Sequence, residues 1–192
     1  MIDEPKVVAI TGSQRDGSHT ATAVEIALDR ARHAGAETDH IDLATLDLPL
    51  FDPDAPDAGD AAELRRRVGA ADAVLLATPM YHGSIASPLK TALDYCGFDE
   101  FEGTTVGLLA VAGGAFPTAA LDHLRTVARA LDAWVLPHQA AIPDSHAQFA
   151  DGELSDPDLR ARIETLGAEL VRYAGVASYP AETEPATPAA GD

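Results

Sequence analysis

Short apolar runs alternate along the chain with longer stretches in which apolar residues recur every three or four positions. The clearest runs are residues 7–11, 73–78 and 105–111. Uninterrupted apolar runs of this length are typical of parallel strands that are buried on both faces of a sheet. Residues 37–43 and a segment within 134–142 carry a weaker strand pattern, so the sequence predicts five strands.

Stretches with helical periodicity lie between these strands. The first helix is expected at residues 20–34, because Gly35 supplies a stop signal directly after it. Two more helices are expected at 118–131 and 156–174, where leucines and other apolar residues recur on one helix face.

Two further helices carry capping signals at their starts. Asp60 and Glu63 have the spacing of a capping pair, which predicts a second helix after an acidic loop. Ser87 followed by Pro88 predicts an N-cap with proline at the first helical position, opening a helix that runs through Tyr95.

Strands and helices in alternation predict an α/β fold in which helices cover both faces of a parallel sheet. Five strands with this spacing favour the flavodoxin-like three-layer sandwich, with strand order 2-1-3-4-5 and a switch point between strands one and three. We expect one folded domain at residues 1–175 and a disordered tail, rich in Ala, Pro, Glu and Thr, at 176–192.

Composition narrows the class of protein. No apolar run of the 192-residue chain has the length of a membrane helix, and its acidic start lacks the regions of a signal peptide. The single cysteine, Cys96, excludes an internal disulfide and a cysteine-based metal site, and we expect an inert, partly buried thiol there. These features together predict a cytoplasmic protein without a membrane partner or a metal.

The charge of the chain is strongly acidic. Asp and Glu total 31 against 13 Lys and Arg, a formal net charge of −18, and such a surface repels nucleic acid. An ordinary solvated acidic surface is one interpretation. Adaptation to high salt is the interpretation we favour, because only Lys6 and Lys90 are lysines and the acidic residues are spread throughout.

Three loops rich in small residues follow three of the predicted strands, at residues 12–18, 79–84 and 112–115. In open α/β sheets, ligands bind just beyond the carboxyl ends of the strands, and small residues let a ligand approach the backbone closely. The chain is therefore expected to bind a ligand at this edge of the sheet.

The first loop separates the known classes of phosphate site. Gln14 stands where a dinucleotide-binding loop has its second glycine, and Ser18 stands where a P-loop has its lysine, so both classes are disfavoured. What remains are hydroxyls, backbone amides and Arg15 at the start of a helix, which suit a terminal phosphate monoester. A simple connecting turn with a solvated arginine is the alternative.

Two motifs, in this order along the chain, carry a resemblance to a known family: Gly12-Ser13-x-Arg15-x-x-Ser18 and Pro79-x-Tyr81-x-Gly83-Ser84. Over residues 7–173 the chain resembles the NAD(P)H-dependent FMN reductase family. The resemblance implies a homodimer or homotetramer that binds FMN. It also implies that a hydride passes from NADPH or NADH to FMN and then to a small acceptor, such as free flavin or a quinone.

The resemblance also assigns roles by position. Ser13, Arg15 and Ser18 would hold the phosphate of FMN, with Thr20 near the same pocket. The isoalloxazine ring would lie along the second and third loops, largely against backbone atoms: Pro79, Met80, Tyr81, His82, Gly83, Ser84, Gly113 and Gly114. No catalytic side chain is implied, because the flavin carries the chemistry.

Several alternatives stay open at this stage. Met80 and His82 stand where relatives often have Glu and Asn, so the motif fixes neither the acceptor nor the choice between NADPH and NADH. A flavodoxin-type electron carrier, without nicotinamide activity of its own, is the main rival, and a hydrolase of phosphate ligands is a third. Lys90 and Asp94 are expected to form a surface ion pair.

Overall fold

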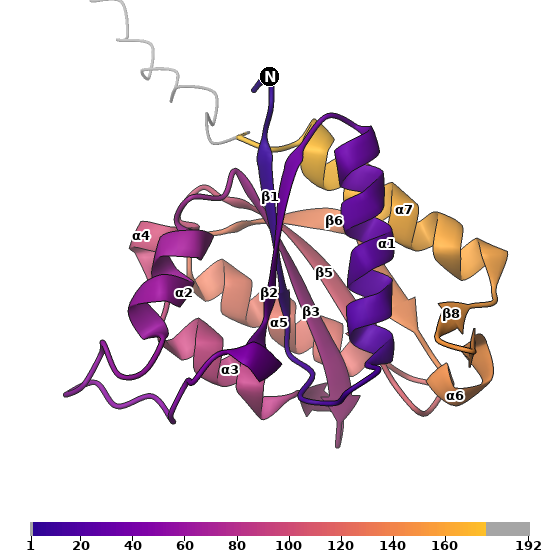
Figure 1. The fold of residues 1–192 in the computed structure, drawn as a ribbon, viewed down its shortest axis with the longest axis horizontal. Helices are drawn as coiled ribbons and strands as arrows, with labels where there is room; N and C mark the ends of the chain where they lie inside the picture. Colours follow the sequence, from indigo (N-terminus) through magenta and orange to yellow (C-terminus); the bar gives the residue numbers. More distant parts are fainter. Residues whose placement is uncertain (1, 176–192) are drawn as a thin grey trace, which may run out of the picture.

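A computed structural model describes residues 2–175, which fold around one central sheet (Figure 1). Its parallel strands are ordered β2-β1-β3-β5-β6. The five strands are β1 Lys6–Thr11, β2 Glu37–Asp42, β3 Ala73–Tyr81, β5 Thr105–Val111 and β6 Trp134–Ile142. The predicted α/β class and strand order are confirmed, with β5 and β6 as the fourth and fifth parallel strands. The predicted tail at 176–192 lies outside the described residues.

Helices cover both faces of the sheet (Figure 1). Helices α1 His19–His33 and α7 Pro157–Arg172 pack on one face, against residues such as Leu75 of β3. The other face carries three helices: α2 Ala61–Val68, α3 Ser87–Asp94 and α5 Thr118–Ala130. Because neighbouring residues of a strand point to opposite faces, the apolar runs fill two separate cores.

Helices α1 and α7 approach each other closely at Gly167. A Cβ atom built on Gly167 would lie 2.2 Å from the carbonyl oxygen of Ala27, so only a glycine permits this packing. The backbone of α7 therefore fixes where α1 lies on the sheet.

Strand β3, which leads into the second of the three loops, is longer than predicted. Strand β3 does not end at residue 78 but continues to Tyr81 and turns back into β4, Ser84–Ile85. His82 and Gly83 form the turn, with φ values of 51° and 77°. The end of β3 is therefore a short hairpin rather than an irregular loop.

Two capping predictions were wrong. Asp60 precedes α2, but its carboxylate accepts the backbone N–H of Asp47 at 2.8 Å and makes no cap hydrogen bond. The N-cap of α3 is Ala86, and Ser87 is already helical. Asp60 has a different hydrogen-bond partner from the one predicted, and α3 begins one residue earlier than predicted.

Several short elements were not predicted: η1 Leu43–Thr45, α4 Phe98–Phe101, α6 Ser145–Gln148 and the hairpin of β7 Phe149–Ala150 with β8 Glu153–Leu154. The main helices match their predicted bounds within a few residues. Within residues 2–175, none of the helices has the length and apolar character needed to cross a membrane.

Candidate functional site

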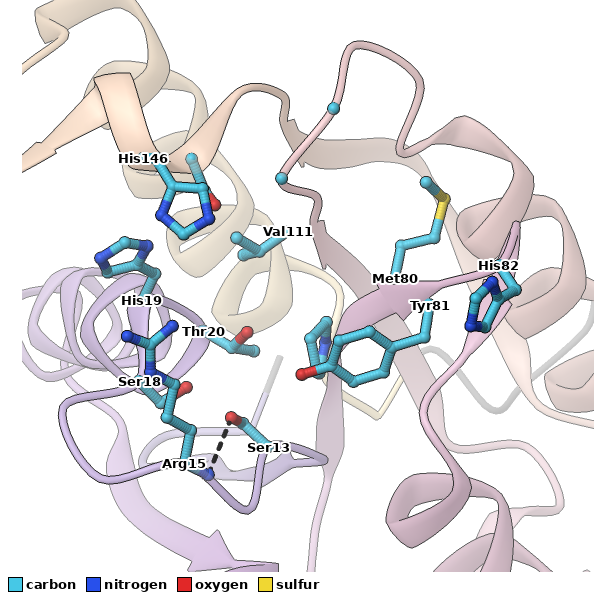
Figure 2. Close-up of a pocket in the computed structure, with 14 residues that line it drawn as sticks. Ser13, Arg15, Ser18, His19, Thr20, Met80, Tyr81, His82, Val111 and His146 are labelled. Carbon is cyan, nitrogen blue, oxygen red and sulfur yellow. Dashed lines mark hydrogen bonds between the residues drawn. The ribbon is translucent and has the colours of Figure 1, made fainter.

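A pocket of about 380 Å³ opens at the carboxyl ends of β1, β3 and β5, beside α6. Figure 2 shows Arg15, Ser18, His19 and His146 on one side of it and the end of β3 on the other. The lining residues are Ser13, Arg15, Ser18, His19, Thr20, Pro79, Met80, Tyr81, His82, Val111, Gly113, Gly114, Ser145 and His146.

The loop between β1 and α1 is held tightly by the strands beneath it. Gly12 donates its N–H to the carbonyl oxygen of Ala77 at 2.8 Å, and a Cβ at Gly12 would lie 2.7 Å from Cβ of Leu89. Ser13 Oγ accepts the N–H of Arg15 at 3.4 Å, and Ser18 caps α1 by accepting the N–H of Ala21 at 3.3 Å. The first turn of α1 therefore points its free N–H groups at the pocket.

Cationic and polar groups gather on this side without acidic partners. Arg15, His19 and His146 line the pocket, whereas none of its lining residues is Asp or Glu. Within residues 2–175, Arg15 forms no ion pair. Burial lowers the pKa of His19 from its ordinary value, and the positive fields of His146 and Arg15 lower it further.

Two buried hydroxyls also face the pocket. Thr20 is 2% exposed and Ser145 is 6% exposed, and both line the cavity. In the described part of the chain, neither hydroxyl makes a hydrogen bond, and no buried side-chain oxygen or nitrogen sealed from solvent lacks one. Since every described side-chain oxygen that is sealed from solvent is paired, the hydroxyl oxygens of these two residues reach the open pocket, where a ligand can hydrogen-bond to them.

The side of the pocket formed by β3 is different in character. Pro79 and Met80 are half-buried, while Tyr81 is 58% exposed and points back toward the pocket in Figure 2. The hydroxyl of Thr78 supports this hairpin, since it donates to the carbonyl of Pro79 at 2.8 Å and accepts the N–H of Ala86 at 2.9 Å.

The structure brings together every residue that the resemblance implied except two. Gly83 and Ser84 do not line the pocket; Ser84 Oγ pairs instead with Nδ1 of His123 on α5 at 2.8 Å. The sequence reasoning missed four lining residues: His19, Val111, Ser145 and His146.

A signal for most of them was present. His19 directly follows Ser18, and Val111 ends a predicted strand. Ser145 and His146 follow the fifth strand, whose carboxyl end lies at the same edge of the sheet.

Two predictions outside the pocket are confirmed. Lys90 and Asp94 form an ion pair one helical turn apart on α3. Cys96 is buried, and burial, followed by the field of Glu100, raises the pKa of its thiol to about 12. A thiol with this pKa is not a nucleophile near neutral pH.

Comparisons with known proteins agree with this geometry. The family model of NADPH-dependent FMN reductase matches residues 5–147. An FMN-dependent NADPH-azoreductase from Staphylococcus aureus (strain USA300) is 31% identical over 183 residues, which cover 91% of this chain and 97% of that protein.

Solved structures share the fold. An NADH:FMN oxidoreductase in its apo form superposes with a TM-score of 0.72 at 24% identity, covering 92% of each chain. A flavoenzyme NAD(P)H:(acceptor) oxidoreductase from Paracoccus denitrificans gives 0.75 at 20% identity, over 91% of this chain and all of that one. The chain belongs to the NADPH-dependent FMN reductase family, and it is an FMN-dependent NAD(P)H oxidoreductase.

Proposed function

We propose that the pocket holds FMN with its phosphate at the loop between β1 and α1 and its ring along the end of β3. We call the first region the phosphate end, defined by Ser13, Arg15, Ser18 and Thr20. The second is the ring end, which consists of Pro79, Met80, Tyr81, His82, Gly113 and Gly114.

The observation that carries this proposal is the set of unpaired groups at the phosphate end. Arg15 has no carboxylate partner within residues 2–175, and the hydroxyl of Thr20, a buried residue that lines the same pocket, makes no hydrogen bond to the described residues. A phosphate monoester satisfies such groups together, because its oxygens accept several hydrogen bonds at once and its charge suits a helix N-terminus. These residues therefore fit the phosphate of FMN.

The ring end fits a flat, partly apolar group. A Cβ built at Gly114 would meet no atom within 4 Å, so the backbone there is open to a ligand. Met80 and Tyr81 line the cavity at the end of β3, where the exposed ring of Tyr81 points toward it (Figure 2). We assign Gly83 and Ser84 to the shape of the hairpin rather than to contact with the ring, because they lie outside the lining.

FMN, when bound, would supply the hydride and two-electron chemistry that links reduced nicotinamide to an acceptor. The chain's own residues bind the phosphate and orient the ring, and the exposed Tyr81 and His82 lie where a second molecule can approach. No side-chain acid or base is needed for this reaction. We propose small molecules as acceptors, with aromatic azo compounds the first class to test because the S. aureus relative is named an azoreductase.

Reduction of the bound flavin tests the function directly. FMN-loaded protein mixed with excess NADPH or NADH should lose the absorbance of oxidised flavin, and a quinone or azo dye should restore it. Flavin that stays oxidised with both nicotinamides would instead support the electron-carrier alternative. Purified protein that binds no FMN at all would support the hydrolase alternative.

We also propose a homodimer or homotetramer in the cytoplasm, where reduced nicotinamides are produced. Large apolar side chains on the surface support self-association: Leu50 is 84% exposed, Phe116 is 78% exposed and Phe51 is also exposed. Surface patches of this kind mark interaction sites when they are contiguous. Light scattering at several protein concentrations gives the mass in solution, and a monomer at all of them would contradict the proposal.

Adaptation to high salt is a separate proposal. With 31 acidic against 13 basic residues, self-repulsion destabilises the folded state at low ionic strength. At about 1 M salt the Debye length is about 3 Å, so most of that repulsion is screened. The melting temperature should therefore rise from dilute to molar salt; a flat or falling value would contradict salt adaptation.

A further inference from the structure

Two histidines join the phosphate end from different parts of the chain. His19 is the first residue of α1, and His146 belongs to α6, which follows β6. Their ring centroids lie 6.1 Å apart with the rings nearly perpendicular, and both rings line the pocket (Figure 2). The resemblance to the family assigns neither residue a role.

The position of the His19 ring is fixed by packing. It stacks on Phe149 of β7 with the centroids 4.2 Å apart and the planes 4° from parallel. The His146 ring lies close to the loop after β5, since its Nε2 is 3.7 Å from where a Cβ on Gly113 would stand. Among the described residues, neither imidazole makes a side-chain hydrogen bond or an ion pair.

The surroundings of these rings favour an anion. Arg15 lies on the same side, Thr20 and Ser145 add hydroxyls that have no hydrogen-bond partner among the described residues, and no carboxylate lines the cavity. In a chain of net charge −18, this is a local excess of positive and hydrogen-bond-donating groups. Two imidazoles, a guanidinium and two hydroxyls together suit a doubly charged phosphate monoester.

Resting on the FMN site proposed above, we propose that His19 and His146 are further ligands of the FMN phosphate and that FMN binding is coupled to uptake of a proton by this pair. The coupling requires that a dianion stabilises an imidazolium more than the empty pocket does, which follows from Coulomb attraction at close range.

The sign of the pH dependence follows from His19. The groups whose charge acts on its ring are His146 and Arg15, neither of them acidic, and its stacking partner Phe149 is uncharged. Burial, followed by the fields of His146 and Arg15, keeps the pKa of His19 below its ordinary value in the free protein. A bound phosphate dianion raises this pKa, so FMN affinity increases as pH falls through the pKa of the complex. Protonation of the phosphate itself opposes this trend only below about pH 6.

The test is FMN binding to apoprotein, followed by flavin fluorescence between pH 6.5 and 8.5 in molar salt. We expect wild type to bind FMN about three- to tenfold more tightly at the lower pH, within the limit of about tenfold per pH unit for one proton. The double variant His19→Gln/His146→Gln should lose most of this slope and bind FMN about tenfold less tightly at pH 6.5. Riboflavin binding should be unaffected by pH and by both substitutions.

His33→Gln is the matched control, because His33 is an exposed histidine at the other end of α1. Calorimetry of wild type in two buffers of different ionisation enthalpy gives a readout that needs no variant. Net proton uptake with FMN, absent with riboflavin, supports the pair; proton release, or no exchange, overturns it.

The outcomes separate this inference from the FMN site itself. If Arg15→Ala weakens FMN binding but the histidine variants do not, the site holds and the histidine proposal is wrong. If the histidine variants change only the preference for NADPH over NADH, the pair belongs to a nicotinamide phosphate and the proposal is also wrong. If FMN and riboflavin bind wild type equally, the assignment of the phosphate end fails first.

Discussion

Two arginines of this chain stand in opposite electrostatic settings. Arg67 of α2 donates to both carboxylate oxygens of Asp39 on β2 and to the carbonyl of His40, whereas Arg15 has no acidic partner in the described part of the chain. Acidic residues outnumber basic ones by more than two to one, so carboxylates are plentiful. An arginine that lines a pocket and still lacks one is poised for a ligand, while a paired arginine serves the fold.

Removing Arg15 is the largest expected effect. Arg15→Ala should lose about 1.5–3 kcal/mol of FMN binding, or about 10- to 150-fold in Kd, because a charge-assisted hydrogen bond to phosphate disappears. Riboflavin affinity and the free energy of unfolding should barely change. Fluorescence titration with both flavins measures this, and equal losses for the two would break the comparison.

Removing Arg67 should have the reverse profile. Arg67→Ala should lower the free energy of unfolding by about 1–2 kcal/mol, because the partly buried carboxylate of Asp39 loses its hydrogen-bond partner. The FMN Kd should stay within about twofold of wild type, since the pair does not line the pocket. Urea unfolding of the two variants side by side is the measurement; a loss of FMN affinity without loss of stability would contradict the assignment.

The Asp39 pair also predicts a smaller, pH-dependent effect. The hydrogen bond from Arg67 holds the pKa of Asp39 below its usual value of 3.8, although burial acts in the opposite direction. A carboxylate with a lowered folded pKa contributes stability above its unfolded pKa and loses it as pH falls through the folded pKa. The stability difference between wild type and Asp39→Asn should therefore be full at pH 6 and shrink below about pH 4. A difference that is constant over this range would argue against the pair.

Removing the His82 side chain is the smallest expected effect, and it tests whether a pocket residue must be buried as well as unpaired to bind FMN. It lines the pocket at the ring end and is exposed, but it is not among buried, unpaired donors. His82→Ala should change KM for nicotinamide or acceptor by about two- to threefold, with smaller effects on the rate of flavin reduction and on FMN affinity, because the exposed side chain lies at the rim of the ring end. Stopped-flow reduction and steady-state kinetics separate these quantities. A large loss of FMN affinity in His82→Ala would show that a donor without a hydrogen-bond partner can bind FMN even when it is exposed.

The parts of the fold that could be predicted are those decided by local pattern. Buried strands such as β5 are continuous apolar runs, and the strand order follows from the alternation of strands and helices. The sequence could group Ser13, Arg15 and Ser18 of the proposed phosphate end because they lie within one short loop, and all three line the pocket. Proximity in sequence and proximity in space coincide there.

The rest depends on contacts between distant segments. His146 reaches the pocket only because β6 lies beside β5 and the chain then turns through α6, and no local pattern indicates that turn. The spacing of Asp60 and Glu63 predicted a helix cap, but the carboxylate of Asp60 accepts the N–H of Asp47 instead. The apolar run predicted that β3 ends at residue 78, yet the strand continues to Tyr81 because β4 pairs with its last residues.

Gly167 contacts no part of the pocket, yet it determines how near the backbone of α7 lies to Ala27 in the middle of α1. Any side chain there would displace the helix whose first turn lines the proposed phosphate end. Position 167 is therefore expected to influence the proposed phosphate end from a distance, through the backbone of α1 alone. Substitutions in the loop around Arg15 can change the residues of the proposed phosphate end directly, whereas a substitution at Gly167 changes it only by moving a helix.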